Sequence, residues 1–206
     1  GFEVTSPTPK QGLGSNTFNA LIGVQKKEIV VKVHKTVDGL ERECFAFDNK
    51  KIPYIVDCYG VTQGADGGNY MLLQKLRDLP DVIDSVLMKK IATNSLIALR
   101  QLWKYNIPWI CKLDHIMMND EGVPKLIDFN DDPYPEIPFY GDGGSTESII
   151  MLGKCDSKGN YIDRGKTPRS GWIAVMEYLC EKNDINKEVL YEAEYAMVEY
   201  EYQALE

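Results

Sequence analysis

The stretch "PKLIDFNDD" (124–132) has the residue types of a metal-binding segment. Two apolar residues, Leu126 and Ile127, lead directly into Asp128, and two further carboxylates follow closely. Carboxylates at the end of a buried strand can hold Mg²⁺, which usually binds through such groups together with the phosphates of a nucleotide. A polar turn would have the same composition, so the interpretation depends on the residues upstream.

A lysine within a predicted strand is the first upstream feature. Lys32 lies in "EIVVKVHK" (28–35), whose density of β-branched residues predicts a strand. A lysine buried in a strand is costly unless a carboxylate pairs with it. Glu43 is the candidate partner, because it lies in the segment 38–51, which we predict to be a short helix with Asp38 as its N-cap.

A glycine turn is the second upstream feature. The segment "QGLGSNTF" (11–18) carries Gly12 and Gly14, followed by Ser15. Backbone N–H groups in such a turn can lie over phosphates because no Cβ atom intrudes. We therefore take Gly12, Gly14 and Ser15 as candidate phosphate contacts.

The elements that must position these residues divide the chain into a strand-rich part and a helical part. Besides the strand at 28–35, the segments 54–63 and 69–76 predict a hairpin. After Leu79 the spacing of apolar residues becomes helical. We predict a single α+β domain of two lobes, with the N-lobe at about 1–74, a hinge at about 74–76 and the C-lobe at about 77–206.

The C-lobe is predicted to carry one hairpin among helices. Apolar residues over 80–105 indicate two helices that break near Thr93 and Asn94. The other predicted elements are hairpin strands at 116–118 and 125–127, a Pro/Gly-rich loop at 133–146, and closing helices at 170–183 and 185–203.

Composition and charge argue against several classes of partner. The 206 residues carry a net charge of −8, whereas a nucleic-acid binder needs a basic face. No apolar run approaches the ~20 residues of a membrane span. The five cysteines are odd in number and lack a CxxC, which predicts neither a disulfide framework nor a zinc site and suits a reducing compartment. We expect a monomer that binds neither nucleic acid nor membrane.

The order of these motifs resembles that of the protein-kinase fold. The segment "IPYIVDCYGV" (52–61) is similar to the kinase segment "HPNIVKLYGV", which follows the helix glutamate at a fixed distance and therefore leads back to Glu43. The string "KLIDFND" stands where kinases have "KLxDFG", and this implies that Asp128 is a metal ligand. The resemblance covers about residues 10–132.

The kinase resemblance also implies a cofactor and its contacts. ATP with Mg²⁺, or with Mn²⁺, would bind between the lobes, with Lys32 on the α/β-phosphates and Glu43 holding Lys32. The string "YMLLQKL" is similar to the last N-lobe strand and the hinge, which implies that Leu73 is the gatekeeper. The remaining nucleotide contacts that it implies are Gln74, Leu76 and Met117.

Two alignments compete for the catalytic loop. The string "KLDHIMMN" reproduces the kinase pattern H-R-D-x-x-x-x-N, with Asp114 as the base and Asn119 as the second metal ligand. Alignment on the hairpin instead makes "NDEG" the turn and moves His115 to the ligand position, with Ile110 where the base belongs. Asp114 is the nearby carboxylate in both alignments, so we take it as the base and keep His115 and Asn119 as ligand candidates.

The chain also departs from the kinase pattern. Thr17 replaces the third glycine of the loop, Asn130 replaces the glycine of D-F-G, no A-P-E follows, and the C-lobe is truncated. The small size, the short activation segment and the acidic, Tyr-rich tail resemble the HopBF family of bacterial type III effector kinases. This resemblance implies a Ser/Thr rather than Tyr kinase that is secreted into the host cytoplasm as a virulence factor. It further implies that the enzyme phosphorylates and inactivates the host heat-shock protein 90 chaperone.

Two alternatives and one docking hypothesis complete the predictions. A small-molecule phosphotransferase shares the fold but needs a helical insertion for which 206 residues leave no room, and a pseudokinase scaffold would bind a nucleotide without catalysis. The loop at 133–146 is apolar and aromatic between prolines. It either packs onto its own lobe or, through Phe139 and Tyr140, holds a protein client.

Overall fold

The chain folds as two units. A computed structural model describes residues 1–6, 8–11, 15–47, 52–64, 67–109, 111–129, 139 and 167–204. The first unit comprises Gly1–Lys51 and Val56–Arg77, and the second comprises Ile52–Ile55 and Asp78–Glu206. Among the described helices, none combines the length and the apolar character that a membrane crossing requires.

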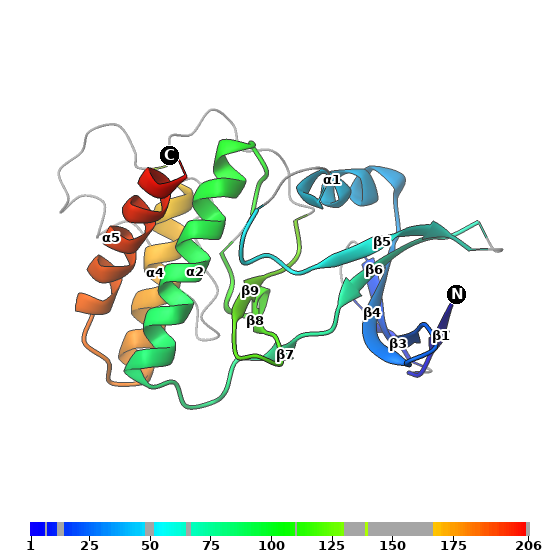
Figure 1. The fold of residues 1–206 in the computed structure, drawn as a ribbon, viewed down its shortest axis with the longest axis horizontal. Helices are drawn as coiled ribbons and strands as arrows, with labels where there is room; N and C mark the ends of the chain where they lie inside the picture. Colours follow the sequence, from blue (N-terminus) through cyan, green and yellow to red (C-terminus); the bar gives the residue numbers. More distant parts are fainter. Residues whose placement is uncertain are drawn as a thin grey trace. The chain divides into compact units, whose positions relative to one another are not determined.

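The first unit is built on an antiparallel sheet (Figure 1). Its strand order is β1-β3-β4-β6-β5, and β2 pairs with β3. Because β4 lies between β3 and β6, both of its edges are hydrogen-bonded, and a polar side chain on this strand is far from the sheet's edge. The strands are β1 (Phe2–Val4), β2 (Lys10–Gln11), β3 (Ser15–Ile22), β4 (Lys27–His34), β5 (Cys58–Gln63) and β6 (Asn69–Gln74).

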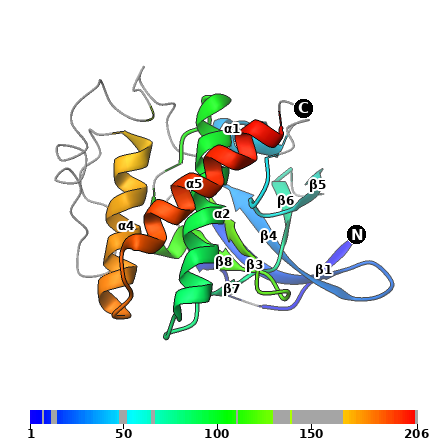
Figure 2. The ribbon, with the colours of Figure 1, turned by 60° about the vertical axis from the view of Figure 1, so that its left-hand side comes forward.

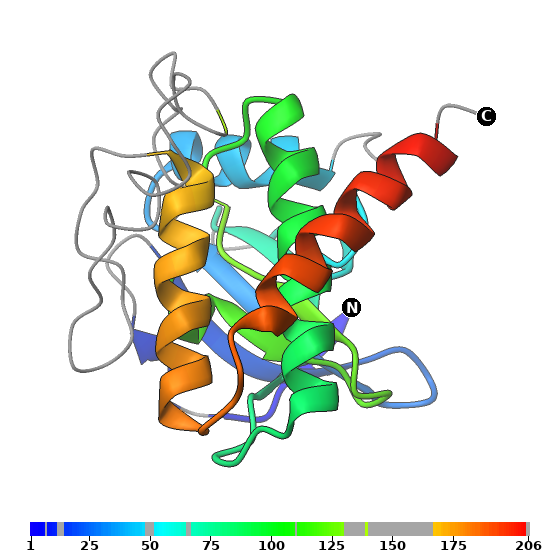
Figure 3. The ribbon, with the colours of Figure 1, turned by 90° about the vertical axis from the view of Figure 1, so that its left-hand side faces the viewer.

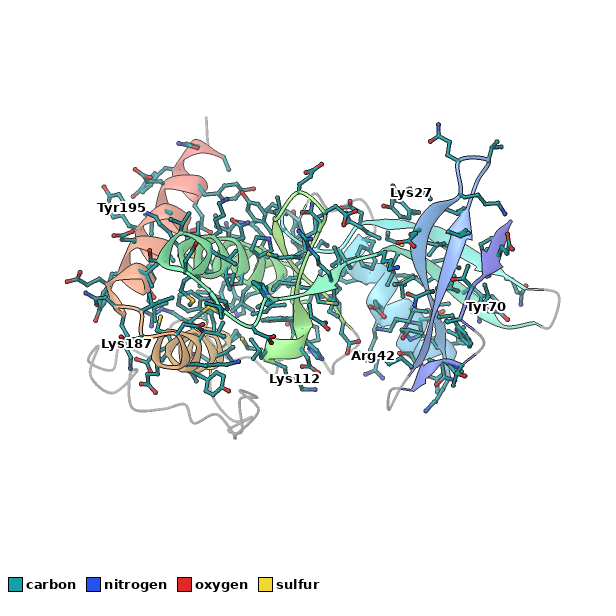
Figure 4. The ribbon with its side chains drawn as sticks, turned by 90° about the horizontal axis from the view of Figure 1, so that it is seen from below. Lys27, Arg42, Tyr70, Lys112, Lys187 and Tyr195 are labelled. Atoms are coloured by element: carbon teal, nitrogen blue, oxygen red, sulfur yellow. The ribbon has the colours of Figure 1, made fainter. Side chains whose placement is uncertain are left out.

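One face of this sheet carries the apolar core of the unit. Ala20, Ile29 and Val31 are fully buried there. Tyr70 of β6 (Figure 4) packs against Phe2 of β1, with ring centroids 5.8 Å apart. Since successive side chains of a strand point to opposite faces, Lys32 lies on the other face from Val31.

The predicted strands of the first unit are present. The strand at 28–35 is β4, one residue shifted, and the hairpin is β5–β6, paired antiparallel from Gln63 opposite Asn69. The strand expected to reach residue 76 ends at Gln74. The sequence pattern therefore located both central strands correctly and overran the end of β6.

Helix α1 (Val37–Phe47) is the predicted short helix, but its N-cap is different. The prediction of Asp38 was wrong, because Asp38 lies inside the first turn and Thr36 caps the helix. The Thr36 hydroxyl accepts a hydrogen bond from the Gly39 N–H at 3.2 Å, and its carbonyl accepts one from Leu40. Both threonine and aspartate can accept a hydrogen bond from the third amide of a helix, so the string "TVDG" contains two possible cap residues. The helix begins at the earlier one, shortly after β4 ends.

Within the described residues, the second unit contains three long helices (Figure 1). Figure 3 shows α5 crossing α2 obliquely, with α4 beside α2. The hairpin β8–β9 lies against α2 (Figure 2). The elements are α2 (Ser85–Lys104), a short 3-10 helix η1 (Leu113–His115), β8 (Ile116–Met118), β9 (Pro124–Leu126), α4 (Pro168–Lys182) and α5 (Glu188–Gln203), and β7 (Arg77–Asp78) forms a three-stranded sheet with β8 and β9.

The predicted break near Thr93 and Asn94 is absent, and α2 is one continuous helix. These two residues are weak helix formers, but each costs only a few tenths of a kcal/mol relative to good ones. The flanking turns bury Ile91 and Leu96, and this packing outweighs the local preference. Ser95 also stays helical, because its hydroxyl donates to the Ile91 carbonyl at 2.6 Å.

Helix α4 is joined to α2 by a buried polar contact. Trp172 is fully buried, and its Nε1–H donates to the Ser95 hydroxyl at 2.8 Å. The helix begins two residues before the predicted start, because Thr167 accepts from the Ser170 N–H and Pro168 occupies the first turn. The closing helices were therefore predicted correctly in type, with errors at their N-terminal ends.

Candidate functional site

Lys32 and Glu43 form a buried ion pair in the first unit. Lys32 is 6% exposed on the central strand β4, and Glu43 is 0% exposed on the inner face of α1. The Lys32 Nζ lies 2.7 Å from the Glu43 Oε2. The structure thus brings together the two residues that the sequence suggested as a pair, and the carboxylate offsets the cost of burying the ammonium.

His34 is a third member of this cluster, which the sequence analysis missed. Its ring Nε2 lies 2.8 Å from the same Glu43 Oε2, and its side chain is as buried as that of Glu43. Residues two apart on a strand share a face, so the position of His34 after Lys32 was a readable signal. The carboxylate of Glu43 therefore faces one lysine and one histidine.

The charge of Glu43 also affects the pKa of the Cys58 thiol on β5. Burial raises the pKa of Cys58, a contact with the Gly60 carbonyl lowers it, and the negative charge of Glu43 raises it further. The thiol is therefore protonated at neutral pH. Cys58 pairs in register with Leu73 of β6, the predicted gatekeeper, which is buried.

The other predicted nucleotide contacts of the first unit are only partly described. Gly12 and Gly14 lie outside the described residues. Ser15 begins β3, is buried and stands opposite His34 in the strand register. The Gln74 N–H donates to the Asp57 carbonyl at 2.8 Å, and Leu76 is half-buried between β6 and β7.

The β8–β9 hairpin of the second unit has the strand pairing that the hairpin alignment of the catalytic loop predicts. Ile116 pairs with Leu126 and Met118 with Pro124, as the hairpin alignment requires. Asn119 holds the turn, because its side-chain oxygen accepts from the backbone N–H groups of Glu121 at 3.1 Å and Val123 at 2.8 Å.

This arrangement separates Asn119 from Asp128. Asn119 follows β8 at the turn, whereas Asp128 follows β9 at the opposite end of the hairpin. His115 instead precedes β8, and its Nε2 lies 3.4 Å from the Asp128 Oδ2. Asn119 therefore lies at the turn and His115 lies beside Asp128, and the choice between them as the second metal ligand stays a prediction.

Hydrogen bonds to Ile127 fix the backbone directly before Asp128. The Ile127 N–H donates to the His115 carbonyl at 3.0 Å, and the Ile127 carbonyl accepts from the Trp109 indole N–H at 2.8 Å. Asp128 has a φ of 69°, a left-handed conformation that is uncommon for residues other than glycine and is tolerated best by Asn and Asp. Trp109 lies 18 residues before Ile127, and no local sequence signal pointed to it.

Asp114 and Met117 flank His115. Asp114 lies in η1 with its side chain exposed, and Met117 is half-buried in the middle of β8. Ile110, which the hairpin alignment places at the base position, lies outside the described residues. The assignment of Asp114 as the base stays a prediction.

The donor set near Asp128 fits a divalent cation. The Asp128 side chain is one third exposed and offers carboxylate oxygens, and His115 offers an imidazole nitrogen beside it. Carboxylates suit Mg²⁺ and Mn²⁺, whereas an imidazole favours the transition metal. Within the described ranges no group of three or more His, Cys, Asp or Glu side chains gathers as a ligand set, so any further ligands come from a substrate, water or other residues.

Phe139 is part of the core of the second unit. It is 1% exposed, and its ring lies 5.7 Å from that of Trp103 on α2, under the Arg100 guanidinium. A side chain buried in this way cannot dock a client, so the docking hypothesis is wrong for Phe139 and the packing alternative holds there. Tyr140 and the rest of the loop at 133–146 lie outside the described residues.

Comparisons with known proteins agree on the fold alone. No protein-family model matches the chain, and no curated protein sequence matches it significantly. Among solved structures, the chain is similar to a crystal structure of the protein kinase Rad53 (1–466) in complex with AMP-PNP. The match has a TM-score of 0.52 and 22% identity over 62% of this chain, and it spans 38% of the Rad53 chain. The chain therefore has a two-lobed, protein-kinase-like α+β fold.

Proposed function

We propose that the protein is an ATP-dependent protein kinase. The observation that carries this proposal is the buried Lys32–Glu43 pair, because a paired lysine on a central strand, next to a helix glutamate, is what a kinase uses to hold the α/β-phosphates. A purely structural pair is a weak source of stability, since two charges must lose their water. The ATP analogue in the similar Rad53 structure supports ATP as the cofactor.

Each candidate residue has a distinct role in this reaction. The Lys32 ammonium binds the non-transferred phosphates, and Glu43 keeps that ammonium oriented. Asp128 and His115 would hold the metal ion, and Asp114 would orient the acceptor hydroxyl. When bound, the metal ion neutralises charge on the transferring phosphoryl group.

The acceptor belongs to the same proposal. We propose Ser/Thr rather than Tyr as the acceptor and the eukaryotic heat-shock protein 90 chaperone as the client. We further propose that the protein is a bacterial effector secreted into the host cytoplasm. These proposals rest on the resemblance to the HopBF family. The burial of Phe139 removes one of the two side chains that could have tied client recognition to the loop at 133–146.

The decisive experiment is transfer of labelled γ-phosphate to the purified chaperone, followed by phosphoamino-acid analysis. Asp128→Ala is the inactive control. A wild-type signal on serine or threonine that the control lacks supports the kinase. Labelling of small hydroxylated or amino compounds but not of protein would instead identify a small-molecule phosphotransferase.

A pseudokinase scaffold is the second candidate, and the loop geometry favours it over the phosphotransferase. His115 stands beside Asp128, and the base candidate Asp114 is exposed in a short 3-10 turn. Calorimetry with AMP-PNP, combined with the transfer assay, separates a scaffold from an active kinase. A protein that binds AMP-PNP tightly with Mg²⁺ or Mn²⁺, yet transfers no phosphate to any protein in a host lysate, is a scaffold.

A further inference from the structure

We infer that His34 is a positioning residue that orients Glu43 toward Lys32. This inference deepens the proposed function and rests on it for its catalytic meaning. The contact itself is structural and can be tested separately. The ring Nε2 of His34 and the Nζ of Lys32 lie 2.8 Å and 2.7 Å from the same carboxylate oxygen, Glu43 Oε2.

The Glu43 carboxylate lies beside the His34 ring. The side chains of His34 and Glu43 are each about 1% exposed, so water does not serve either group. Among the described residues, neither nitrogen of the His34 ring has a well-aligned hydrogen bond. A buried imidazole with its proton on Nε2 is then stabilised chiefly by the nearby carboxylate.

Glu43 is one of three buried residues on α1. The buried residues of this helix are Leu40, Glu43 and Ala46, and the largest apolar one is a single leucine. A glutamate side chain that is attracted only by Lys32 could follow the ammonium as it moves toward a phosphate. An added attraction from a rigid ring on the same strand holds the carboxylate in one place instead.

The first turn of α1 also comes close to the same ring. A Cβ atom added to Gly39 would lie 3.3 Å from the His34 Nδ1 and 3.2 Å from the Thr36 hydroxyl. The backbone of α1 therefore rests near one edge of the ring, while Glu43 meets the other nitrogen. His34 therefore lies close to the first turn of the helix and meets Glu43 in the second turn, and so relates the position of α1 to that of Lys32.

The test uses three substitutions in the full chain. His34→Leu removes the ring nitrogens at similar volume, and His34→Gln keeps an amide N–H near the position of Nε2. Val31→Ala is the matched control, because it removes buried methyl groups from the opposite face of the same strand. The readouts are the Kd of AMP-PNP by calorimetry, KM for ATP and kcat.

We expect His34→Leu to weaken AMP-PNP binding and raise KM for ATP about tenfold, with kcat changed less than about threefold. His34→Gln should recover most of the affinity. Val31→Ala should lower Tm and leave Kd near that of the wild type. The inference is overturned if His34→Leu binds AMP-PNP normally, or if Val31→Ala weakens binding as much as His34→Leu does.

A stability cycle separates this inference from the proposed function. His34→Leu, Glu43→Gln and the double variant are melted side by side. Interacting side chains give non-additive changes in Tm, and additive changes would refute the contact whatever the catalytic activity. A wild-type protein that neither binds AMP-PNP nor transfers phosphate would refute the kinase proposal and leave the cycle intact.

Discussion

Removing one partner of the Lys32–Glu43 pair should cost more stability than removing both. In Glu43→Leu, the Lys32 ammonium on the central strand β4 loses the Glu43 carboxylate at a position that is only 6% exposed. Breaking a buried ion pair in this way typically costs about 3–5 kcal/mol. For a chain of about 200 residues, 1 kcal/mol shifts Tm by roughly 2–4 °C, so we expect a fall of roughly 6–20 °C.

The two single variants should differ in how much Tm they lose. In Lys32→Met, the Glu43 carboxylate still has His34 Nε2 at 2.8 Å, so the loss of Tm should lie at the low end of that range. The double variant Lys32→Met/Glu43→Leu replaces the pair by apolar groups of similar volume and should be more stable than Glu43→Leu alone. All three variants should lose phosphoryl transfer, because the phosphate-binding ammonium is absent or misplaced.

The assay combines thermal melts with transfer of labelled γ-phosphate at saturating ATP. Melts of the four proteins give the coupling between the two sites directly, and the transfer assay separates stability from catalysis. The reasoning is refuted if Glu43→Leu melts within about 2 °C of the wild type. It is equally refuted if the double variant transfers phosphate at the wild-type rate, since the pair would then have no catalytic role.

Four further predictions test the second unit. Asp128→Asn should abolish phosphoryl transfer while Tm changes by less than about 3 °C, because asparagine tolerates the left-handed backbone and the side chain is partly exposed; a calorimetric melt beside the transfer assay checks both, and residual turnover near wild type would contradict it. His115→Asn should lower the ratio of Mn²⁺- to Mg²⁺-supported turnover several-fold, and an unchanged ratio would remove His115 from the metal site. Phe139→Ser should lower Tm by roughly 6–20 °C by leaving a cavity next to Trp103, with transfer per folded molecule unchanged; a normal melt with lost chaperone phosphorylation would restore the docking hypothesis. Burial raises the pKa of the Cys180 thiol to about 11, so the thiol of the unfolded chain ionises at lower pH than that of the folded protein, and stability present below about pH 9 should be lost as the pH rises toward 11. Plots of Tm against pH over that range should be flatter for Cys180→Ala than for the wild type. Parallel plots would refute the raised pKa.

The sequence alone identified the ion pair because two independent patterns met on it. The β-branched run around Lys32 predicted a strand, and the spacing from the segment 52–61 led back to Glu43. Period-two alternation also placed His34 on the face of Lys32, so the third member of the cluster was within reach. It was overlooked because a lone histidine on a strand suggests no role until its partner on the covering helix is known.

Other features depended on packing over long distances. The break expected at Thr93 and Asn94 followed local propensity, and burial of the neighbouring turns overrode it. Phe139 could be read either as core or as a docking residue, because an aromatic side chain between prolines suits both environments. Its contacts with Trp103 and Arg100 decide the matter, and neither residue lies near it in the sequence.

The presentation of Asp128 shows how the second unit holds a candidate metal ligand. A left-handed backbone costs a residue with a side chain about 1–2 kcal/mol, and at Asp128 that cost falls on a functional candidate. Both peptide groups of the preceding Ile127 are fixed, one by the His115 carbonyl and one by the Trp109 indole, and each such hydrogen bond contributes about 0.5–1.5 kcal/mol. These two bonds together match the backbone cost, so contacts within the unit hold the backbone of Asp128 in this conformation. Because His115 fixes Ile127 through its carbonyl and faces Asp128 through its ring, one residue both orients the carboxylate and adds a nitrogen donor beside it. In the proposed kinase, this double use would let a short hairpin with a histidine beside Asp128 offer two donors to a divalent cation.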